Sequence, residues 1–173
     1  MVFGWFKKSR NGTNPAPAPL SPEASAEREL PEDRHARIKH LCAEGDRHAG
    51  EHEFEAALAL YWQAFDLLPE PSTNWDAGTW ILTAIGDANF LAGDFVAGRD
   101  NLATAMHYPN AIGNPFIHLR LGQCQFELGN LGRAADELAR AYMGAGSEIF
   151  SNDHSRYFDF LKTRLDPPAS GQW

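Results

Sequence analysis

The stretch LRLGQCQFELGNLGRAADELARAY, residues 119–142, decides the fold of this chain. Apolar residues recur in it at helical spacing, first at Leu119, Leu121, Phe126 and Leu128, and then at Leu131, Ala134, Ala135 and Leu138. A glycine inside a helix costs about 1 kcal/mol relative to alanine, yet Gly122 lies within the first pattern. Gly129 lies between the two patterns, and Gly132 lies near the start of the second. We therefore expect two helices joined by a short turn, with the glycines serving close packing or the turn.

The same pattern occurs three times in the chain. Gly45, Gly86 and Gly122 align, with spacings of 41 and 36 residues. A small residue follows each glycine after twelve positions, a large apolar one after sixteen and an alanine after nineteen. The small residues are Ala57, Gly98 and Ala134, the large apolar residues are Tyr61, Leu102 and Leu138, and the alanines are Ala64, Ala105 and Ala141. No segment alternates apolar and polar residues over the length of a strand.

The repeated pattern resembles the tetratricopeptide repeat (TPR), a helix–turn–helix unit of about 34 residues. The resemblance implies an all-α fold, in which three TPR-like repeats form a short right-handed solenoid. The repeats are expected at about 38–71, 79–112 and 115–148, and a C-terminal capping helix at about 152–166. The two helices of a unit cross closely, so we expect a side chain at the aligned glycine to hold them apart.

We expect Gly45 to face Ala57 across this crossing and Gly122 to face Ala134. Gly129 and Gly132 are expected to bracket the turn, where a positive φ is needed.

The sequence departs from the family at two aromatic positions. The residues three places after the glycines are His48, Asn89 and Gln125, and those four places before are Leu41, Leu82 and His118. We expect the tryptophans at 62, 75 and 80 to fill part of the space. His118 is expected to be a buried histidine with satisfied hydrogen bonds.

Residues 1–30 are expected to form a disordered tail and a Pro/Ala-rich linker, residues 31–166 the TPR domain, and residues 167–173 a frayed end. The first ten residues, MVFGWFKKSR, place apolar residues before basic ones, the reverse of a secretory signal. Residues 1–8 could touch an anionic membrane, or their aromatic side chains could dock on the domain. Two well-separated cysteines, outside any CxxC pair, indicate a reducing compartment and a cytoplasmic location.

The charge is distributed unevenly. Residues 1–40 hold seven Lys/Arg and five Asp/Glu, which gives +2, whereas residues 41–173 hold eight and eighteen, which gives −10. An acidic domain argues against nucleic acid and favours a basic protein partner. We find no nucleophile, phosphate-binding or metal motif, and expect no catalysis, cofactor or metal. His48 and His52 lack a third ligand. We expect a monomer or a weak dimer.

In this family the first helix of each repeat lines the concave face. The groove-facing positions are then Lys39, Cys42, Asp46, Ala49 and Gly50; Trp80, Thr83, Asp87, Phe90 and Leu91; and Phe116, Leu119, Gln123, Phe126 and Glu127. The candidate partner-binding residues are Asp46, Trp80, Asp87, Phe90, Phe116, Arg120, Gln123, Phe126 and Glu127. One subtype of the family binds a C-terminal carboxylate through basic and amide side chains at fixed inner positions, and this sequence matches that subtype only at Arg120. The groove is thus expected to be aromatic and acidic, which suits a basic segment with apolar anchors.

The stretches GNPFIHLRLGQCQFELG and YFDFLKTRL resemble small bacterial TPR proteins encoded beside contact-delivered toxins. This resemblance implies an immunity protein that binds and neutralises a basic toxin or effector domain, covering a folded surface with loops such as 70–78 or with the convex side. The alternatives are a cytosolic TPR chaperone or adaptor, which grips an extended segment in the groove, and a scaffold in a secretion or membrane-linked assembly.

Overall fold

The computed structural model describes residues 30–167, 171 and 173. These residues form seven α-helices and two short 3-10 helices, and no strand. The α-helices are α3 (Glu32–Gly50), α4 (Phe54–Phe65), α5 (Asp76–Leu91), α6 (Phe95–Ala105), α7 (Pro115–Glu127), α8 (Leu131–Ala145) and α9 (Arg156–Lys162). The 3-10 helices are η2 (Ser72–Asn74) and η3 (Ser147–Phe150). No helix of the described residues is long and apolar enough to span a membrane.

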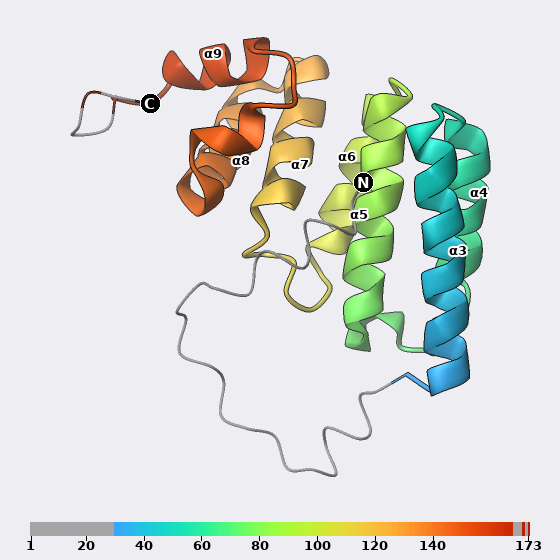
Figure 1. The fold of residues 1–173 in the computed structure, drawn as a ribbon. Helices are drawn as coiled ribbons and strands as arrows, with labels where there is room; N and C mark the ends of the chain where they lie inside the picture. Colours follow the sequence, from blue (N-terminus) through green and yellow to red (C-terminus); the bar gives the residue numbers. More distant parts are fainter. Residues whose placement is uncertain (1–29, 168–170, 172) are drawn as a thin grey trace, which may run out of the picture.

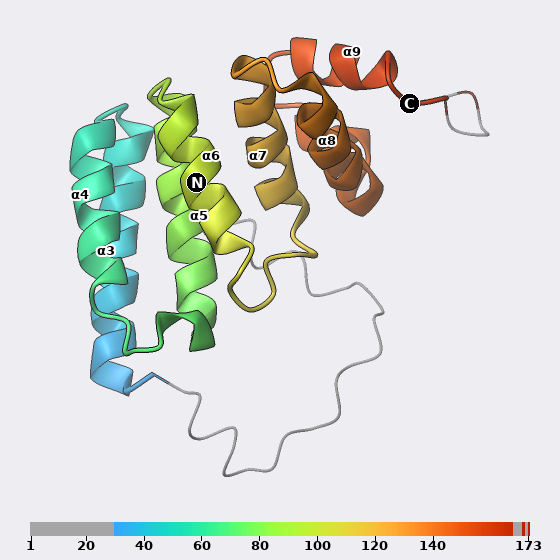
Figure 2. The same ribbon diagram turned by 180° about the vertical axis from the view of Figure 1, so that it is seen from behind.

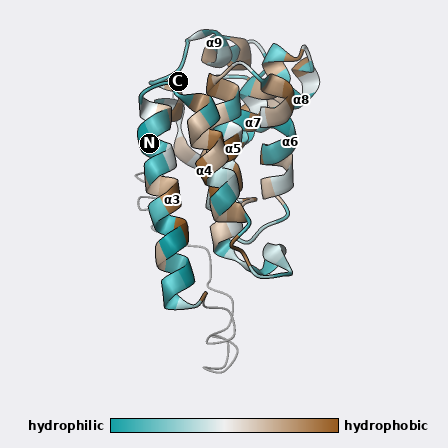
Figure 3. Ribbon diagram, turned by 90° about the vertical axis from the view of Figure 1, so that its right-hand side faces the viewer, coloured by the Kyte–Doolittle hydropathy of each residue, from teal (hydrophilic) through white to brown (hydrophobic). Residues whose placement is uncertain are grey.

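The helices pack pairwise in the order of the sequence. The pairs α3–α4, α5–α6 and α7–α8 make the most extensive contacts, and α4–α5 and α6–α7 join one pair to the next. The two opposite views in Figures 1 and 2 show this succession from α3 at one end to α9 at the other. In Figure 3 α3 is mostly hydrophilic, whereas α4 carries more hydrophobic residues. The predicted all-α, TPR-like arrangement of three helical pairs is therefore confirmed.

The aligned glycines allow the two helices of each pair to approach, and the atoms nearest to them belong to a residue other than the predicted alanine. A Cβ atom on Gly122 would lie 2.8 Å from Cγ of Leu138 and 3.0 Å from its backbone nitrogen. A Cβ on Gly45 would lie 2.4 Å from the ring of Tyr61, and one on Gly86 2.4 Å from Cγ of Leu102. Each glycine thus makes room for the large residue sixteen places later, because that side chain projects across the crossing.

The small residues twelve places after the glycines serve the same crossing from the second helix. Ala57 and Ala134 are fully buried. A Cβ on Gly98 would lie 3.3 Å from the carbonyl oxygen of Gly86. The backbones therefore approach at this position, and the large residue four places later fills the adjacent space.

The turn inside each pair has the same backbone conformation in all three repeats. The residue seven places after the aligned glycine has a positive φ: 62° at His52, 82° at Gly93 and 75° at Gly129. The prediction for Gly129 is thus confirmed. The prediction for Gly132 is wrong, because this residue already belongs to α8 and a Cβ there would meet open space.

Polar side chains replace the family's aromatic residues beside these turns. Nδ1 of His48 lies 2.5 Å from Oε2 of Glu53, and Nδ2 of Asn130 donates to Oε1 of Gln125 at 2.9 Å. The backbones of these pairs are hydrogen-bonded as well: the N–H of Glu53 donates to the carbonyl oxygen of His48, and the N–H of Asn130 to that of Gln125, both at 2.9 Å. In these two repeats the polar residue therefore connects the end of the first helix to the start of the second through both side-chain and backbone hydrogen bonds. Trp75 and Trp80 pack against the N-terminal core, but Trp62 is 40% exposed and does not fill it as expected.

His118 is buried with both ring nitrogens in hydrogen bonds, as expected. Nδ1 lies 2.5 Å from Oε2 of Glu137, and Nε2 lies 2.7 Å from the carbonyl oxygen of Ile112. Burial lowers the pKa of His118, but the hydrogen bonds to Glu137 and Ile112 and the negative charge of Glu137 outweigh it, and the net pKa is raised. A carbonyl and a carboxylate both accept, so the ring donates from both nitrogens.

The C-terminal cap differs from the single helix expected at 152–166. The chain forms η3, a short turn, and then α9, which covers only Arg156–Lys162. The polar run Ser-Asn-Asp-His-Ser before α9 favours turns over helix, and Pro167 disfavours helix at the residue before it. Tyr157 and Leu161 on α9 nevertheless face the core, at 3% and 0% exposure. The predictions for residues 1–29 and for 168–170 and 172 lie outside the described part of the chain.

Candidate protein-binding surfaces

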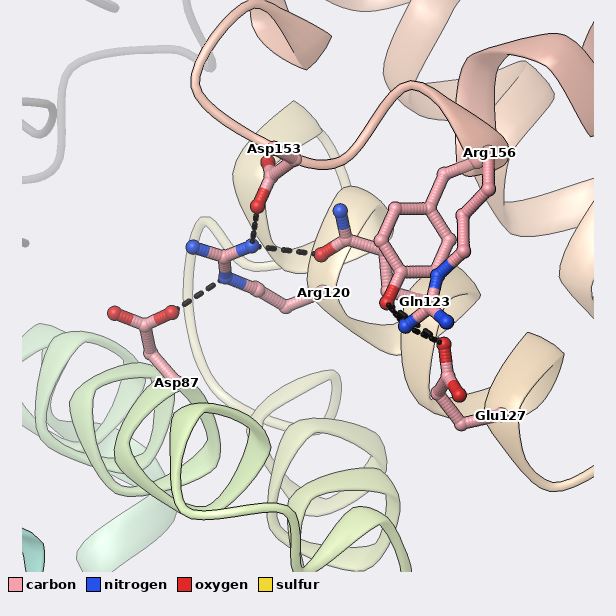
Figure 4. A network of polar contacts seen from close by, with 7 residues as sticks. Asp87, Arg120, Gln123, Glu127, Asp153 and Arg156 are labelled. Atoms are coloured by element: carbon pink, nitrogen blue, oxygen red, sulfur yellow. Dashed lines mark hydrogen bonds and ion pairs between the residues drawn. The ribbon is translucent and has the colours of Figure 1, made fainter.

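An ionic network stands at the centre of the predicted groove. The guanidinium of Arg120 on α7 donates from Nε to Asp87 on α5, at 2.5 Å. Its Nη1 donates to Gln123 at 2.7 Å and to Asp153, before α9, at 2.5 Å. Figure 4 shows Arg120 between these partners. The network therefore ties the second repeat, the third repeat and the C-terminal segment together.

Arg120 is held as a buried cation. Its guanidinium carbon lies 4.8 Å from the ring centroid of Phe90 and 5.2 Å from that of Phe116. Burial lowers the pKa of Arg120, but the charges of Asp87 and Asp153 and their hydrogen bonds outweigh it, so the pKa is raised. Two carboxylates and two aromatic faces thus compensate for the loss of water around one buried charge.

A second cluster links the end of α7 to the start of α9. Glu127, on the last turn of α7, pairs with Arg156 at 2.5 Å and accepts a hydrogen bond from the hydroxyl of Tyr157 at 2.7 Å. The ring of Tyr157 packs against Phe126 and Phe90, with centroids 5.5 Å and 6.2 Å apart. Burial and the hydrogen bond to Glu127 raise the pKa of Tyr157 to about 12.

The structure divides the nine predicted groove residues into two groups. Six contact the C-terminal segment or one another around Arg120, and they are Asp87, Phe90, Arg120, Gln123, Phe126 and Glu127. Phe116 is half-buried beneath the same guanidinium. Asp46 and Trp80 belong to the N-terminal half, where Asp46 accepts a hydrogen bond from the hydroxyl of Tyr61 at 2.8 Å. Two of the three predicted acids are therefore neutralised by arginines of this chain.

Sequence reasoning missed Asp153, Arg156 and Tyr157 as groove residues. One signal was present, because Arg120 lies between Leu119 and Leu121 in an apolar helix. A charge at such a position needs a partner, but the sequence alone does not say which of the acids supplies it.

One group of described residues has the composition of a metal site. Ligand atoms of His48, Glu51 and Glu53 lie within 4.8 Å of one another at the turn between α3 and α4. The guanidinium of Arg47 already donates to Glu51 at 2.9 Å and lies 2.8 Å from Nε2 of His48. A metal ion would have to displace this cation, so the arrangement gives no support for a metal.

These features define the class of the fold as a TPR-type helical domain. Among solved structures, the chain is similar to the C-terminal TPR-containing domain of a Plasmodium falciparum protein described as FK506-binding. The match has a TM-score of 0.61 and 14% sequence identity, and it covers 78% of this chain and 90% of the other. No protein-family model and no curated protein sequence matches the chain. At this identity the likeness shows the fold alone.

Proposed function

We propose that the protein is a non-catalytic binding module for a protein partner with a basic surface, and more specifically an immunity protein that neutralises a secreted toxin. The TPR-type fold supports the binding role, and the charge of the domain supports the basic partner. The contact is proposed on the outer surface of α4 and the loop that follows it, since four residues of the predicted groove already contact the C-terminal segment.

The observation that carries this proposal is an uninterrupted run without positive side chains. Residues 48–98 contain no Lys or Arg and eight Asp or Glu. Glu55, Asp66, Glu70, Asp76 and Asp94 of this run are exposed. Because no cation of the same run offsets them, these carboxylates attract a basic partner and speed its association.

An aromatic anchor lies within this acidic surface. Trp62 is 40% exposed and lies on α4 between Glu55 and Asp66. Residues seven and eleven positions apart share one face of a helix, so Glu55, Trp62 and Asp66 form one stripe. Tryptophan is one of the residue types enriched at binding hot spots.

The loop between α4 and α5 is held in one shape before any partner binds. The indole nitrogen of Trp75 donates to the carbonyl oxygen of Pro69 at 2.7 Å, and the hydroxyls of Ser72 and Tyr108 are 2.9 Å apart. Nδ2 of Asn110 donates to Asp76 at 3.2 Å. An ordered loop loses little entropy on binding, which favours recognition of a folded surface.

The test is a native pull-down from the source cells at low salt, with mass spectrometry of proteins recovered near a one-to-one ratio. The proposal expects one basic toxin domain, whose activity the protein blocks. An exported protein held as an extended segment, with loss of binding in Trp80→Ala rather than Trp62→Ala, would favour the chaperone. Recovery of a secretion-machine or membrane component would favour the scaffold.

A further inference from the structure

Helix α5 has no continuous solvent-exposed stripe. From Ala77 to Asn89 every residue is buried except Trp80, which is half-buried. Helices at the surface of a domain normally keep an exposed polar face. The groove-facing Thr83 of α5 is 0% exposed, and Cys42, at the same repeat position on α3, is 1% exposed. This face is buried, and the described helices in contact with α5 are chiefly α6 and α4, followed by α7 and α3.

The same part of the groove holds a carboxylate that lacks a cationic partner among the described residues. Asp46 is half-buried, and the ion pairs of the described residues do not include it. Burial raises the pKa of Asp46, although the hydrogen bond from the Tyr61 hydroxyl lowers it. By contrast, Asp87 has Arg120 and Glu127 has Arg156. A cation brought to Asp46 would therefore pair with a carboxylate in a partly dry site.

The chain itself contains a segment with the matching chemistry. Residues 1–10, MVFGWFKKSR, which lie outside the described residues, carry three aromatic side chains followed by three basic ones. They precede residues 11–29, and nineteen residues can span up to about 63 Å. The described chain begins at Leu30, beside the first turn of α3, and the nineteen residues of α3 extend about 28 Å. The segment can thus reach any point of the groove.

We propose that residues 1–10 bind in cis to the concave face formed by α3 and α5, with aromatic side chains over Cys42 and Thr83 and a basic side chain beside Asp46. The segment and the C-terminal residues then occupy different halves of the predicted groove. A partner that enters the groove must displace the segment, whereas a partner on the outer surface of α4 need not. This proposal does not depend on the identity of any partner.

The experiment places a photoreactive benzophenone amino acid at position 6 of the full-length protein. After irradiation, the monomer is isolated from a denaturing gel and its cross-linked peptides are identified by mass spectrometry. The proposal expects cross-links within one chain to residues 39–50 or 76–91. Cross-links only to residues 11–29, only to α4, α6 or α8, or only between two copies would overturn it, as would the absence of any cross-link.

A charge-reversal pair tests the role of Asp46 in the same assay. Asp46→Lys should lower the yield of these cross-links by about threefold or more, the effect of losing one partly exposed ion pair. Glu55→Lys makes the same charge change on the outer face of α4, and it should leave the yield unchanged. Equal yields in the two variants, with circular dichroism showing both folded, would contradict electrostatic docking at Asp46.

Discussion

The close crossing of α7 and α8 predicts opposite effects for the same substitution at two glycines of this hairpin. Gly122→Ala places a methyl group 2.8 Å from Cγ of Leu138 and 3.0 Å from its backbone nitrogen. Gly132→Ala places a methyl group in open space, in a helical residue without a positive φ. The two variants have the same composition, so the comparison isolates the crossing.

The magnitudes follow from two opposing terms. Alanine gains about 1 kcal/mol over glycine in a helix interior, whereas overpacking a core costs about 1–3 kcal/mol. A different Leu138 rotamer cannot relieve the contact between the new methyl group at position 122 and the backbone nitrogen of Leu138. We therefore expect the cost of overpacking to exceed the gain in helix propensity at Gly122. The net result is a loss of about 1 kcal/mol for Gly122→Ala. Gly132→Ala, near the helix start, should gain about 0.5–1 kcal/mol.

Urea and thermal unfolding followed by circular dichroism measure both free energies. The expected gap of about 2 kcal/mol corresponds to about 4–8 °C in the midpoint for a domain of this size. If Gly122→Ala is as stable as Gly132→Ala, the glycine is not needed for the crossing and the explanation of the repeat pattern is wrong.

Three further substitutions test the hydrogen bonds, charges and turns. The folded-state pKa of His118 is raised, so its stabilisation should be complete below the unfolded value of about 6.5 and be lost as pH rises through the folded value. The stability difference between wild type and His118→Gln in urea should therefore shrink between pH 6 and pH 9, and a constant difference would argue against a charged ring beside Glu137. Asp153→Asn leaves Arg120 with one carboxylate and should destabilise by about 1–3 kcal/mol, with faster hydrogen exchange in α9; unchanged exchange would mean that the pair does not hold the cap. Gly129→Ala, at a φ of 75°, should cost about 1–2 kcal/mol in thermal unfolding, and an unchanged midpoint would contradict the assigned turn.

The repeat architecture was readable from the sequence because its spacing is imposed by geometry. A close helix crossing requires a small residue at a fixed distance from a large one, and the pattern Gly45–Ala57–Tyr61 recurs with the same intervals in the other two units. The contact of each glycine with the large residue sixteen places later was not predicted. Interval counting shows which positions meet at a crossing, but not whether a glycine accommodates the small residue or the large one.

The candidate site was less predictable, because its contacts depend on a segment distant in sequence. Asp153 and Arg156 reach Arg120 and Glu127 only because η3 and the turn after it bring the chain back to α7. No hydrophobic periodicity in the sequence predicts the course of the chain through η3 and this turn. The exposed position of Trp62 was also missed, since a tryptophan in an apolar helix is more often part of the core.

The most direct test of the central claim compares binding of the recovered partner to two charge-reversed proteins. Glu55→Lys/Glu70→Lys reverses charges on the proposed surface, whereas Asp136→Lys/Glu148→Lys reverses two exposed charges elsewhere. The account predicts at least a tenfold loss of affinity at low salt, about 1.4 kcal/mol, for the first variant, and little change for the second. Equal affinities, or a greater loss in the second variant, would contradict partner binding through the acidic surface around α4.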